Sequence, residues 1–410
     1  MGQSLDPVPG GPVRRRRVIY VPGYDPFHAR RYRELYRKEA QAQAGISGYE
    51  IAIAGRGGDP YGWSVRARIE GTEVESEVSV LGWSDIVKAS MDRGLVQAYL
   101  QALRTLRVYV GSGALGGVLR LRKGPAIAAI YPLVVLILQL LVALVFAAAV
   151  GWAIASVAPG GLALAGLAVV PPVLTWFARH DNLVLARYLM HNFAFSAQFG
   201  GANPPELEVR MAEFAEVVEA ACRSDVDEVL VVGHSSGAHL AVSILSDLIR
   251  DGRLAGTRPE LSLLTLGEVI PMVSFLPTAS RLRADLHFLS ASDALVWVDI
   301  TAPGDGCAFA LCDPAAVSGV APEGQRWPLI LSAAFTQTLS PERWKALRWR
   351  FFRLHFQYLC AFDRPADYDY FRITAGPKTL GDRFGHRTSS ASAIRRPVSR
   401  QRSMERRDAR

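Results

Sequence analysis

Residues 229–241 read V-L-V-V-G-H-S-S-G-A-H-L-A. The first four of these residues form a short aliphatic run of the kind that makes a buried parallel strand. Residues 233–237 then match G-x-S-x-G around Ser235, and apolar residues continue at helical spacing as far as Leu248. Strand, glycine-flanked serine and helix predict a sharp turn that presents the Ser235 hydroxyl at the carboxyl end of the strand. An ordinary strand-to-helix turn is the alternative interpretation.

The chain on either side of this turn alternates between strand and helix patterns. Residues 18–21 predict a first core strand, which Pro22-Gly23-Tyr24-Asp25 follows as a turn. The other predicted elements are a helix over 27–44, antiparallel strands between 49 and 81, a long helix over 83–109, helices over 181–197 and 206–222, and strands over 261–266 and 295–300. Such alternation predicts an α/β protein with a doubly wound, mostly parallel sheet.

A long uncharged interval interrupts this pattern. Residues 124–178 contain no Asp, Glu, Lys or Arg, and about 20 apolar residues are enough to cross a bilayer. The interval divides at residues 158–161, which predicts a transmembrane hairpin with spans over 128–153 and 162–177. The second span is short and contains Pro171-Pro172, so we expect it to be kinked or re-entrant. A buried hydrophobic hairpin in a soluble protein is the alternative.

Basic residues flank the hairpin on both sides. Arg120, Arg122 and Lys123 precede it, and Arg179 follows it. Because two spans return the chain to the same side, the positive-inside rule places the flanking domain in the cytoplasm.

The net charge of +8 is concentrated at the C-terminus, where residues 381–410 hold nine arginines against Asp382, Glu405 and Asp408. The rest of the chain is close to neutral, which argues against nucleic acid as a partner. The Ser- and Arg-rich composition predicts a disordered tail over 377–410, either a solubilising terminus or an attachment to anionic lipid.

The four cysteines have no metal-ligand spacing, so we expect reduced thiols and no metal or other cofactor. Residues 1–12 lack an apolar core, so no secretory signal is expected.

The V-V-G-H-S-S-G motif, with its strand and helix, resembles the α/β-hydrolase superfamily of lipases and esterases. The resemblance covers residues 15–110 and 180–375. It implies one hydrolase domain in two parts, with boundaries at 13–123 and 179–376, separated by the hairpin at 124–178. It also implies the chain order serine, acid, histidine for a catalytic triad.

Four aspartates follow Ser235 as candidates for the acid: Asp293, Asp299, Asp305 and Asp313. Asp299 alternates within the strand over 295–300, so we expect it to face a structural partner. Asp305 lies in T-A-P-G-D-G just past the end of that strand, where the family places its acid. We therefore favour Asp305, with Asp299 as the second choice.

The histidine has one candidate that fits the implied order. His287 precedes the acid and His386 lies in the tail, which leaves His355. An apolar stripe over residues 341–359 predicts one continuous helix, whereas the family places this histidine on a loop at a helix start. Either the helix breaks near Arg353, or His355 is not the catalytic histidine. A packed or stacking histidine is the alternative interpretation.

The resemblance also implies an oxyanion hole with two backbone donors. One is the amide of Ser236, the residue after the nucleophile, and the other comes from the loop after an earlier strand. Residues 22–25 supply that loop here, and we select the amide of Tyr24. The histidine that usually precedes the glycine in the family is replaced by Pro22.

The sequence thus predicts a membrane-anchored serine ester hydrolase that forms an acyl-enzyme on Ser235, with an acyl ester or a lipid as substrate. The choice of a lipid rests on the hairpin alone. Two alternatives stay open, an acyltransferase that uses the same triad and an inactive membrane scaffold with the hydrolase fold.

Overall fold

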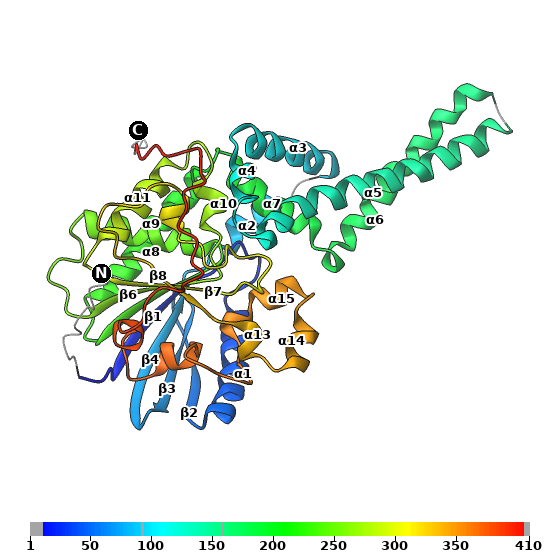
Figure 1. The fold of residues 1–410 in the computed structure, drawn as a ribbon. Helices are drawn as coiled ribbons and strands as arrows, with labels where there is room; N and C mark the ends of the chain where they lie inside the picture. The colour runs from blue at the N-terminus through cyan, green and yellow to red at the C-terminus, as the bar shows by residue number, and fades with distance from the viewer. Residues whose placement is uncertain (1–10, 92–93, 158, 406–410) are drawn as a thin grey trace.

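A computed structural model describes residues 11–91, 94–157 and 159–405. In that part of the chain, eight strands form one sheet in the order β2-β3-β4-β1-β5-β6-β7-β8 (Figure 1). The strands are β1 (Arg15–Val21), β2 (Glu50–Arg56), β3 (Gly62–Ile69), β4 (Thr72–Val80), β5 (Glu228–His234), β6 (Glu260–Leu266), β7 (Val296–Thr301) and β8 (Leu329–Ser332). β4, β1 and β5 to β8 run parallel, while β2 and β3 pair antiparallel at one edge. The predicted α/β class and mostly parallel sheet are therefore confirmed.

β5 shows why its aliphatic run forms the centre of the sheet. All seven of its residues are buried, and neighbouring side chains enter opposite layers. Val229 and Val231 pack with one hydrophobic cluster, while Leu230 and Val232 pack with the other. A strand that is covered on both faces needs an apolar run rather than alternation.

Helices cover both faces of the sheet (Figure 1). The layer that packs on Val229 and Val231 contains α2 (Ser84–Met91), α8 (Pro205–Cys222), α9 (Gly237–Arg250), α10 (Ile270–Ser274), α11 (Ser280–Ala291) and α12 (Pro314–Val317). The opposite layer contains α1 (Arg30–Ser47), α13 (Phe335–Thr338), α14 (Pro341–Leu347), α15 (Phe351–His355), η3 (Gln357–Leu359), α16 (Tyr370–Ala375) and α17 (Leu380–Phe384). The chain is therefore doubly wound, as its sequence predicts.

The strand order places two loops next to each other. β1 lies between β4 and β5, and Val21 pairs with Gly233 at the carboxyl ends of β1 and β5. The loop after β1 and the turn after β5 therefore start side by side. In open α/β sheets, ligands bind at such carboxyl ends where the strand order reverses.

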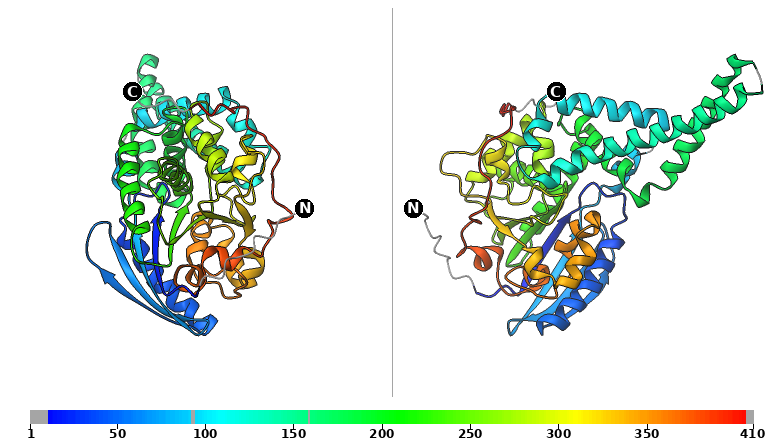
Figure 2. Two further views of the ribbon diagram at one scale, coloured as in Figure 1. Left: turned by 90° about the vertical axis from the view of Figure 1, so that its left-hand side faces the viewer. Right: turned by 45° about the vertical axis from the view of Figure 1, so that its right-hand side comes forward.

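The uncharged interval forms two apolar helical segments that project from the body (Figures 1 and 2). α5 spans Lys123–Ala155, and the return segment consists of η1 (Gly160–Val169) and α6 (Val170–Arg179). Both segments are long and apolar enough to cross a membrane. Pro171 and Pro172 lie in the first turn of α6, where a missing N–H costs little. Gly166 leaves no room for a Cβ against α5, so the two segments pack closely.

Shorter helices join the hairpin to the body. These are α3 (Leu95–Gly111), α4 (Ala114–Val118), η2 (Asp181–Leu183) and α7 (Ala186–Ala197). The sequence predicts one helix over 83–109, but the structure has the two helices α2 and α3, with residues 92–93 outside the described part.

The C-terminal stretch differs from its prediction. The composition of residues 377–410 predicts disorder, yet residues 377–405 follow the surface of the body (Figure 1). Ile394 pairs with Cys312, the Val398 amide donates to the Val317 carbonyl (3.0 Å), and Arg283 donates to the Ser403 carbonyl (2.7 Å). The prediction of disorder rests on the average composition, in which the arginines dominate. It does not take account of the few apolar side chains and backbone groups that contact the body. Residues 406–410 lie outside the described part.

Candidate active site

The turn after β5 holds Ser235 in a left-handed backbone conformation, with φ of 56°. Such a φ is unfavourable for a residue with a Cβ, so the surrounding structure has to impose it. The Ser235 amide donates to the Leu266 carbonyl (2.9 Å), and the Ser235 carbonyl accepts from the Ala238 amide (3.1 Å). These bonds fix the turn between β5 and α9.

Three glycines make this turn sterically feasible. A Cβ on Gly233 would lie 2.7 Å from Ala238 Cα, and a Cβ on Gly237 would overlap the Val21 carbonyl. On the facing loop, a Cβ on Gly23 would lie 2.8 Å from Ser235 Cβ. The flanking glycines of the motif are therefore required by close packing of α9 and β1 around Ser235.

His355 lies where the predicted helix over 341–359 breaks. α14 ends at Leu347, α15 runs from Phe351 to His355, and η3 follows. The side chains of α14 and α15 pack on the loop after β7: Trp344 contacts Gly304, and Phe351 contacts Gly306. The apolar stripe thus packs partly against the loop that carries Asp305.

The structure brings His355 and Asp305 together. His355 Nδ1 lies 2.7 Å from Asp305 Oδ2, and both side chains are buried. Asp305 is held by the Tyr358 hydroxyl, which donates to Oδ2 (3.1 Å), and by the Cys307 amide, which donates to Oδ1 (2.9 Å). Burial by itself lowers the pKa of His355, but the charge and hydrogen bond of Asp305 raise it above its ordinary value. Asp305 therefore fixes the imidazole orientation and stabilises its charged form.

Ser235 and His355 both approach the segment of Leu266 and Gly267. The Ser235 amide is bonded to Leu266, and a Cβ on the next residue, Gly267, would lie 3.1 Å from His355 Cε1. Gly267 has φ of 54°, and the lack of a side chain there leaves space for the imidazole. Within the described residues, no hydrogen bond joins the Ser235 hydroxyl to His355.

The two predicted oxyanion residues border the same turn. Ser236 is the residue before α9, so its amide belongs to the first turn, where N–H groups have no partner within the helix. Tyr24 lies in the loop after β1, which is fixed by two bonds. The Trp83 indole donates to the Pro22 carbonyl (2.9 Å), and the Tyr188 hydroxyl donates to the Tyr24 carbonyl (2.6 Å).

Asp25 adds a second buried carboxylate near His355. It accepts hydrogen bonds from the hydroxyls of Tyr32 (2.8 Å) and Tyr188 (3.4 Å). Burial raises the pKa of Asp25, and the charge of Asp25 contributes to the raised pKa of His355. Sequence reasoning gave Asp25 no role, although it follows Tyr24 directly in the loop.

His234 is another site residue that sequence reasoning missed. Its Nε2 donates to the His355 carbonyl (3.1 Å), and the two rings lie 5.0 Å apart between centroids. Burial lowers the pKa of His234 to about 3, so the ring is neutral. The only signal in the sequence was its position immediately before Ser235.

The other candidates from the sequence have different surroundings. Asp299 accepts a hydrogen bond from the Thr265 hydroxyl (2.7 Å), Asp313 caps α12, and His287 bonds to the Val320 carbonyl (2.8 Å). Asp299 therefore faces a structural partner, as its position in the strand predicts.

One group of side chains has the spacing of a metal site. Ligand atoms of Asp305, Cys307 and His355 all lie within 4.8 Å of one another. Burial raises the pKa of the Cys307 thiol, which favours the protonated form, and Nδ1 of His355 already bonds to Asp305. Metal binding needs a thiolate and a free ring nitrogen, so this group fits a hydrogen-bonded acid–histidine pair better.

No family model matches this chain, and no curated protein or solved structure was found to match it.

Proposed function

We propose that the chain is a membrane-anchored serine ester hydrolase with an α/β-hydrolase-like fold. The observation that carries this proposal is the 2.7 Å pair of His355 and Asp305, whose imidazole approaches Gly267. The residue before Gly267, Leu266, bonds to the amide of Ser235, a glycine-flanked serine of positive φ. A serine alone is a weak nucleophile and needs a neighbouring base that a third group orients. Asp305 supplies the orientation, and His355 is the base.

The proton path follows from the pair. In the proposed reaction, His355 Nδ1–H donates to Asp305, which leaves the lone pair of Nε2 to accept the proton of the Ser235 hydroxyl. Ser235 Oγ then forms a bond to the acyl carbon as the proton moves to His355. The imidazolium returns that proton to the leaving alcohol, and water cleaves the acyl-enzyme through the same groups.

The negative charge on the carbonyl oxygen needs donors that are fixed in advance. The amides of Ser236 and Tyr24 are proposed for this role, and one such donor contributes about 2.7–4 kcal/mol to transition-state stabilisation. Tyr188 and Trp83 hold the loop of Tyr24 through hydrogen bonds to its backbone, which supports a preorganised donor.

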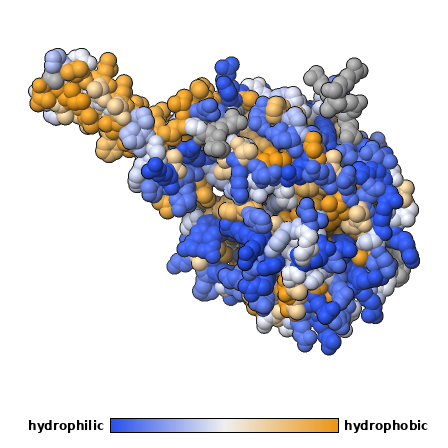
Figure 3. Space-filling view, turned by 180° about the vertical axis from the view of Figure 1, so that it is seen from behind, coloured by the Kyte–Doolittle hydropathy of each residue, from blue (hydrophilic) through white to orange (hydrophobic). Residues whose placement is uncertain are grey.

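Contacts at the base of the hairpin support a lipid or another apolar ester as substrate. A Cβ on Gly124, in the first turn of α5, would lie 2.8 Å from Gly306 Cα, next to Asp305. Tyr188, in the helix after the hairpin, bonds to the loop of Tyr24. Figure 3 shows the projecting hairpin covered with apolar side chains. A hairpin in a bilayer would therefore hold both loops of the site close to the membrane surface, on the cytoplasmic side by the positive-inside rule.

Labelling with a fluorophosphonate probe tests the proposal. We expect the protein in lipid nanodiscs to be labelled and to hydrolyse p-nitrophenyl octanoate, and Ser235→Ala to lose both activities by at least about 10³-fold. The matched control is Ser246→Ala in α9, the helix that follows Ser235, which removes only a hydroxyl that donates to the Asp285 carbonyl. Folded protein that is not labelled at Ser235 would favour the inactive scaffold. An added alcohol that competes with water for the acyl group would favour acyl transfer.

A further inference from the structure

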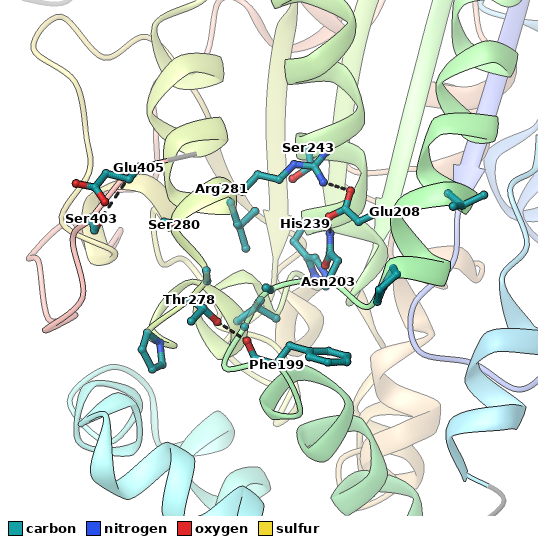
Figure 4. Close-up of a pocket in the computed structure, with 18 residues that line it drawn as sticks. Phe199, Asn203, Glu208, His239, Ser243, Thr278, Ser280, Arg281, Ser403 and Glu405 are labelled. Carbon is teal, nitrogen blue, oxygen red and sulfur yellow. Dashed lines mark hydrogen bonds and ion pairs between the residues drawn. The ribbon is translucent and has the colours of Figure 1, made fainter. Parts of the chain in front are cut away.

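A cavity of about 900 Å³ lies between α8, α9 and α11, on the side of the sheet that α9 covers (Figure 4). Apolar side chains form much of its wall, among them Phe199, Val209, Val273 and Leu282. Its volume lies in the range of small-molecule sites, roughly 300–1,000 Å³. In Figure 4, Ser403 and Glu405 lie on one side of the cavity and His239 and Asn203 on the other.

A much smaller cavity of about 10 Å³ adjoins the large one. The two share His239 and Val273 in their walls, and the small cavity reaches Tyr24 and Ser236. A volume of this size corresponds to roughly one water-sized probe. The small cavity is the inner end of the large one. It can therefore hold one hydroxyl group or one water, next to the turn that carries Ser235.

Two polar groups at this inner end have no partner within the described residues. They are His239 Nδ1 and Ser236 Oγ, and their residues are only 8% and 2% exposed. An unsatisfied buried polar group costs about 1–3 kcal/mol, so a partner from outside the chain is expected.

The charges around the cavity determine which head group fits. No described residue in the wall of the small cavity is an Asp, Glu, Lys or Arg. Burial lowers the pKa of His239 to about 4, so its ring is neutral at pH 7 and offers one donor and one acceptor. Arg281, in the wall of the large cavity, already pairs with Glu208 and Asp247. Glu405, the other charged residue of the large cavity, lies on the side opposite His239 (Figure 4). At the inner end, a charged head group would therefore lose its hydration without gaining a counter-ion.

We propose that this cavity binds an uncharged amphiphile with an aliphatic chain and a single hydroxyl head. The chain lies along Phe199, Val209 and Leu282, and the hydroxyl bonds to His239 and Ser236. The site goes beyond the proposed ester hydrolysis, because Ser235 is absent from both cavity walls and binding can be measured without hydrolysis. Its inner end does border the proposed oxyanion hole, since Tyr24 and Ser236 line the small cavity.

NMR on histidine-labelled protein tests this site. Full-length protein with ¹³Cε1-histidine is placed in lipid nanodiscs and titrated with 1-octanol, and His239→Gln assigns the resonance of His239. We expect this resonance to shift saturably, while the other seven of the eight histidines report that the fold is unchanged. Octanoate and octylammonium have the same chain with a charged head, so we expect their midpoints to be at least tenfold higher.

A variant pair separates the cavity from general partitioning into lipid. Ala202 is exposed and lines both cavities, so Ala202→Trp is expected to fill the passage and abolish the shift. Ala255→Trp, at an exposed alanine that is not in either wall, is expected to bind like the parent. The proposal is wrong if the His239 signal does not shift at saturating octanol, if the three ligands have equal midpoints, or if Ala202→Trp leaves the shift intact.

Discussion

At the scale of single residues, the site depends on how buried charges are distributed. Asp305 and Asp299 are both buried, yet only Asp305 is bonded to a histidine. Burial raises the pKa of Asp299, which favours its protonated form, and its Oδ1 accepts from Thr265. The two aspartates should therefore respond differently to the same substitution.

Replacement of each aspartate by asparagine tests this difference. Asp305→Asn leaves an amide that cannot stabilise the imidazolium, so we expect kcat/KM for p-nitrophenyl octanoate to fall by about 10³–10⁴-fold. Asp299→Asn replaces a largely neutral acid by a neutral amide, and we expect a change of less than about threefold. If Asp299→Asn has the large effect and Asp305→Asn the small one, the assignment of the acid is wrong.

The pH dependence of hydrolysis tests the environment of His355. Burial lowers its pKa, but Asp305 and, more weakly, Asp25 raise it above the ordinary value of about 6.5. A base acts in its neutral form, so kcat/KM should rise with pH through a midpoint above about 6.5. The contribution of the His355–Asp305 ion pair to folding stability changes with pH in the opposite direction. It is fully present below the ordinary pKa of His355 and is lost as pH rises through the raised pKa of the folded state.

Asp25→Asn removes one of the charges that raise this pKa. We expect the midpoint of the pH–rate profile to move to lower pH, with Asp85→Asn as a control, because Asp85 pairs with Arg210 on the surface. A midpoint that stays constant or rises in folded Asp25→Asn protein would contradict the role given to Asp25.

At the scale of elements, the turn between β5 and α9 depends on backbone contact with β1. α9 begins so close to β1 that a Cβ at Gly237 overlaps the Val21 carbonyl, and a strand carbonyl cannot move aside as a flexible side chain can. The broken helix around Trp344 and Phe351 shows the same dependence on packing, because these side chains contact the glycines on either side of Asp305.

Gly237→Ala is therefore expected to destabilise the protein by at least about 3 kcal/mol and to abolish fluorophosphonate labelling. Gly45→Ala is the matched control. Gly45 lies inside α1, where a Cβ meets nothing within 4 Å, so alanine should be neutral or stabilising by up to about 1 kcal/mol. Chemical denaturation measures both variants, and equal stabilities would refute the steric explanation.

At the scale of the whole molecule, the hairpin and the sheet meet at the site. Gly124 contacts the loop of Asp305, and Tyr188 contacts the loop of Tyr24 and the ring of Phe352 in α15. The hairpin segment, which lies in the sequence between the first strands and β5, therefore helps to hold the loops of the site in place. Its outer surface consists of side chains that no element of the body covers (Figure 3).

Charges placed in the middle of α5 test whether this surface lies in a bilayer. Leu138 and Leu141 are about half exposed, and each lysine at the centre of a membrane span costs about 2.5–3.5 kcal/mol. We expect Leu138→Lys with Leu141→Lys to move the protein out of the carbonate-resistant membrane fraction. Ile46→Lys, on an exposed part of α1, should leave it there. Retention of the double variant would argue that the hairpin does not span the membrane.

Features that depend on neighbours along the chain could be predicted from the sequence. Aliphatic runs predicted β1, β5, β6 and β7, the glycines around Ser235 predicted a tight turn, and the uncharged interval predicted two apolar segments. These features follow from local sterics and hydrophobic periodicity, and both can be recognised within a short stretch of sequence.

Contacts between residues that are far apart in the sequence are established only in the folded chain. Folding joined His355 to Asp305, the acid that the sequence had favoured, and broke the helix near Arg350, close to the position considered from the sequence. It also brought Asp25 and His234 to the imidazole and packed residues 377–405 on the body. Each of these outcomes depends on side chains that lie far apart in sequence and meet only when the sheet forms. No local pattern encodes such distances, so the sequence predicted the turn and the structure arranged the groups around it.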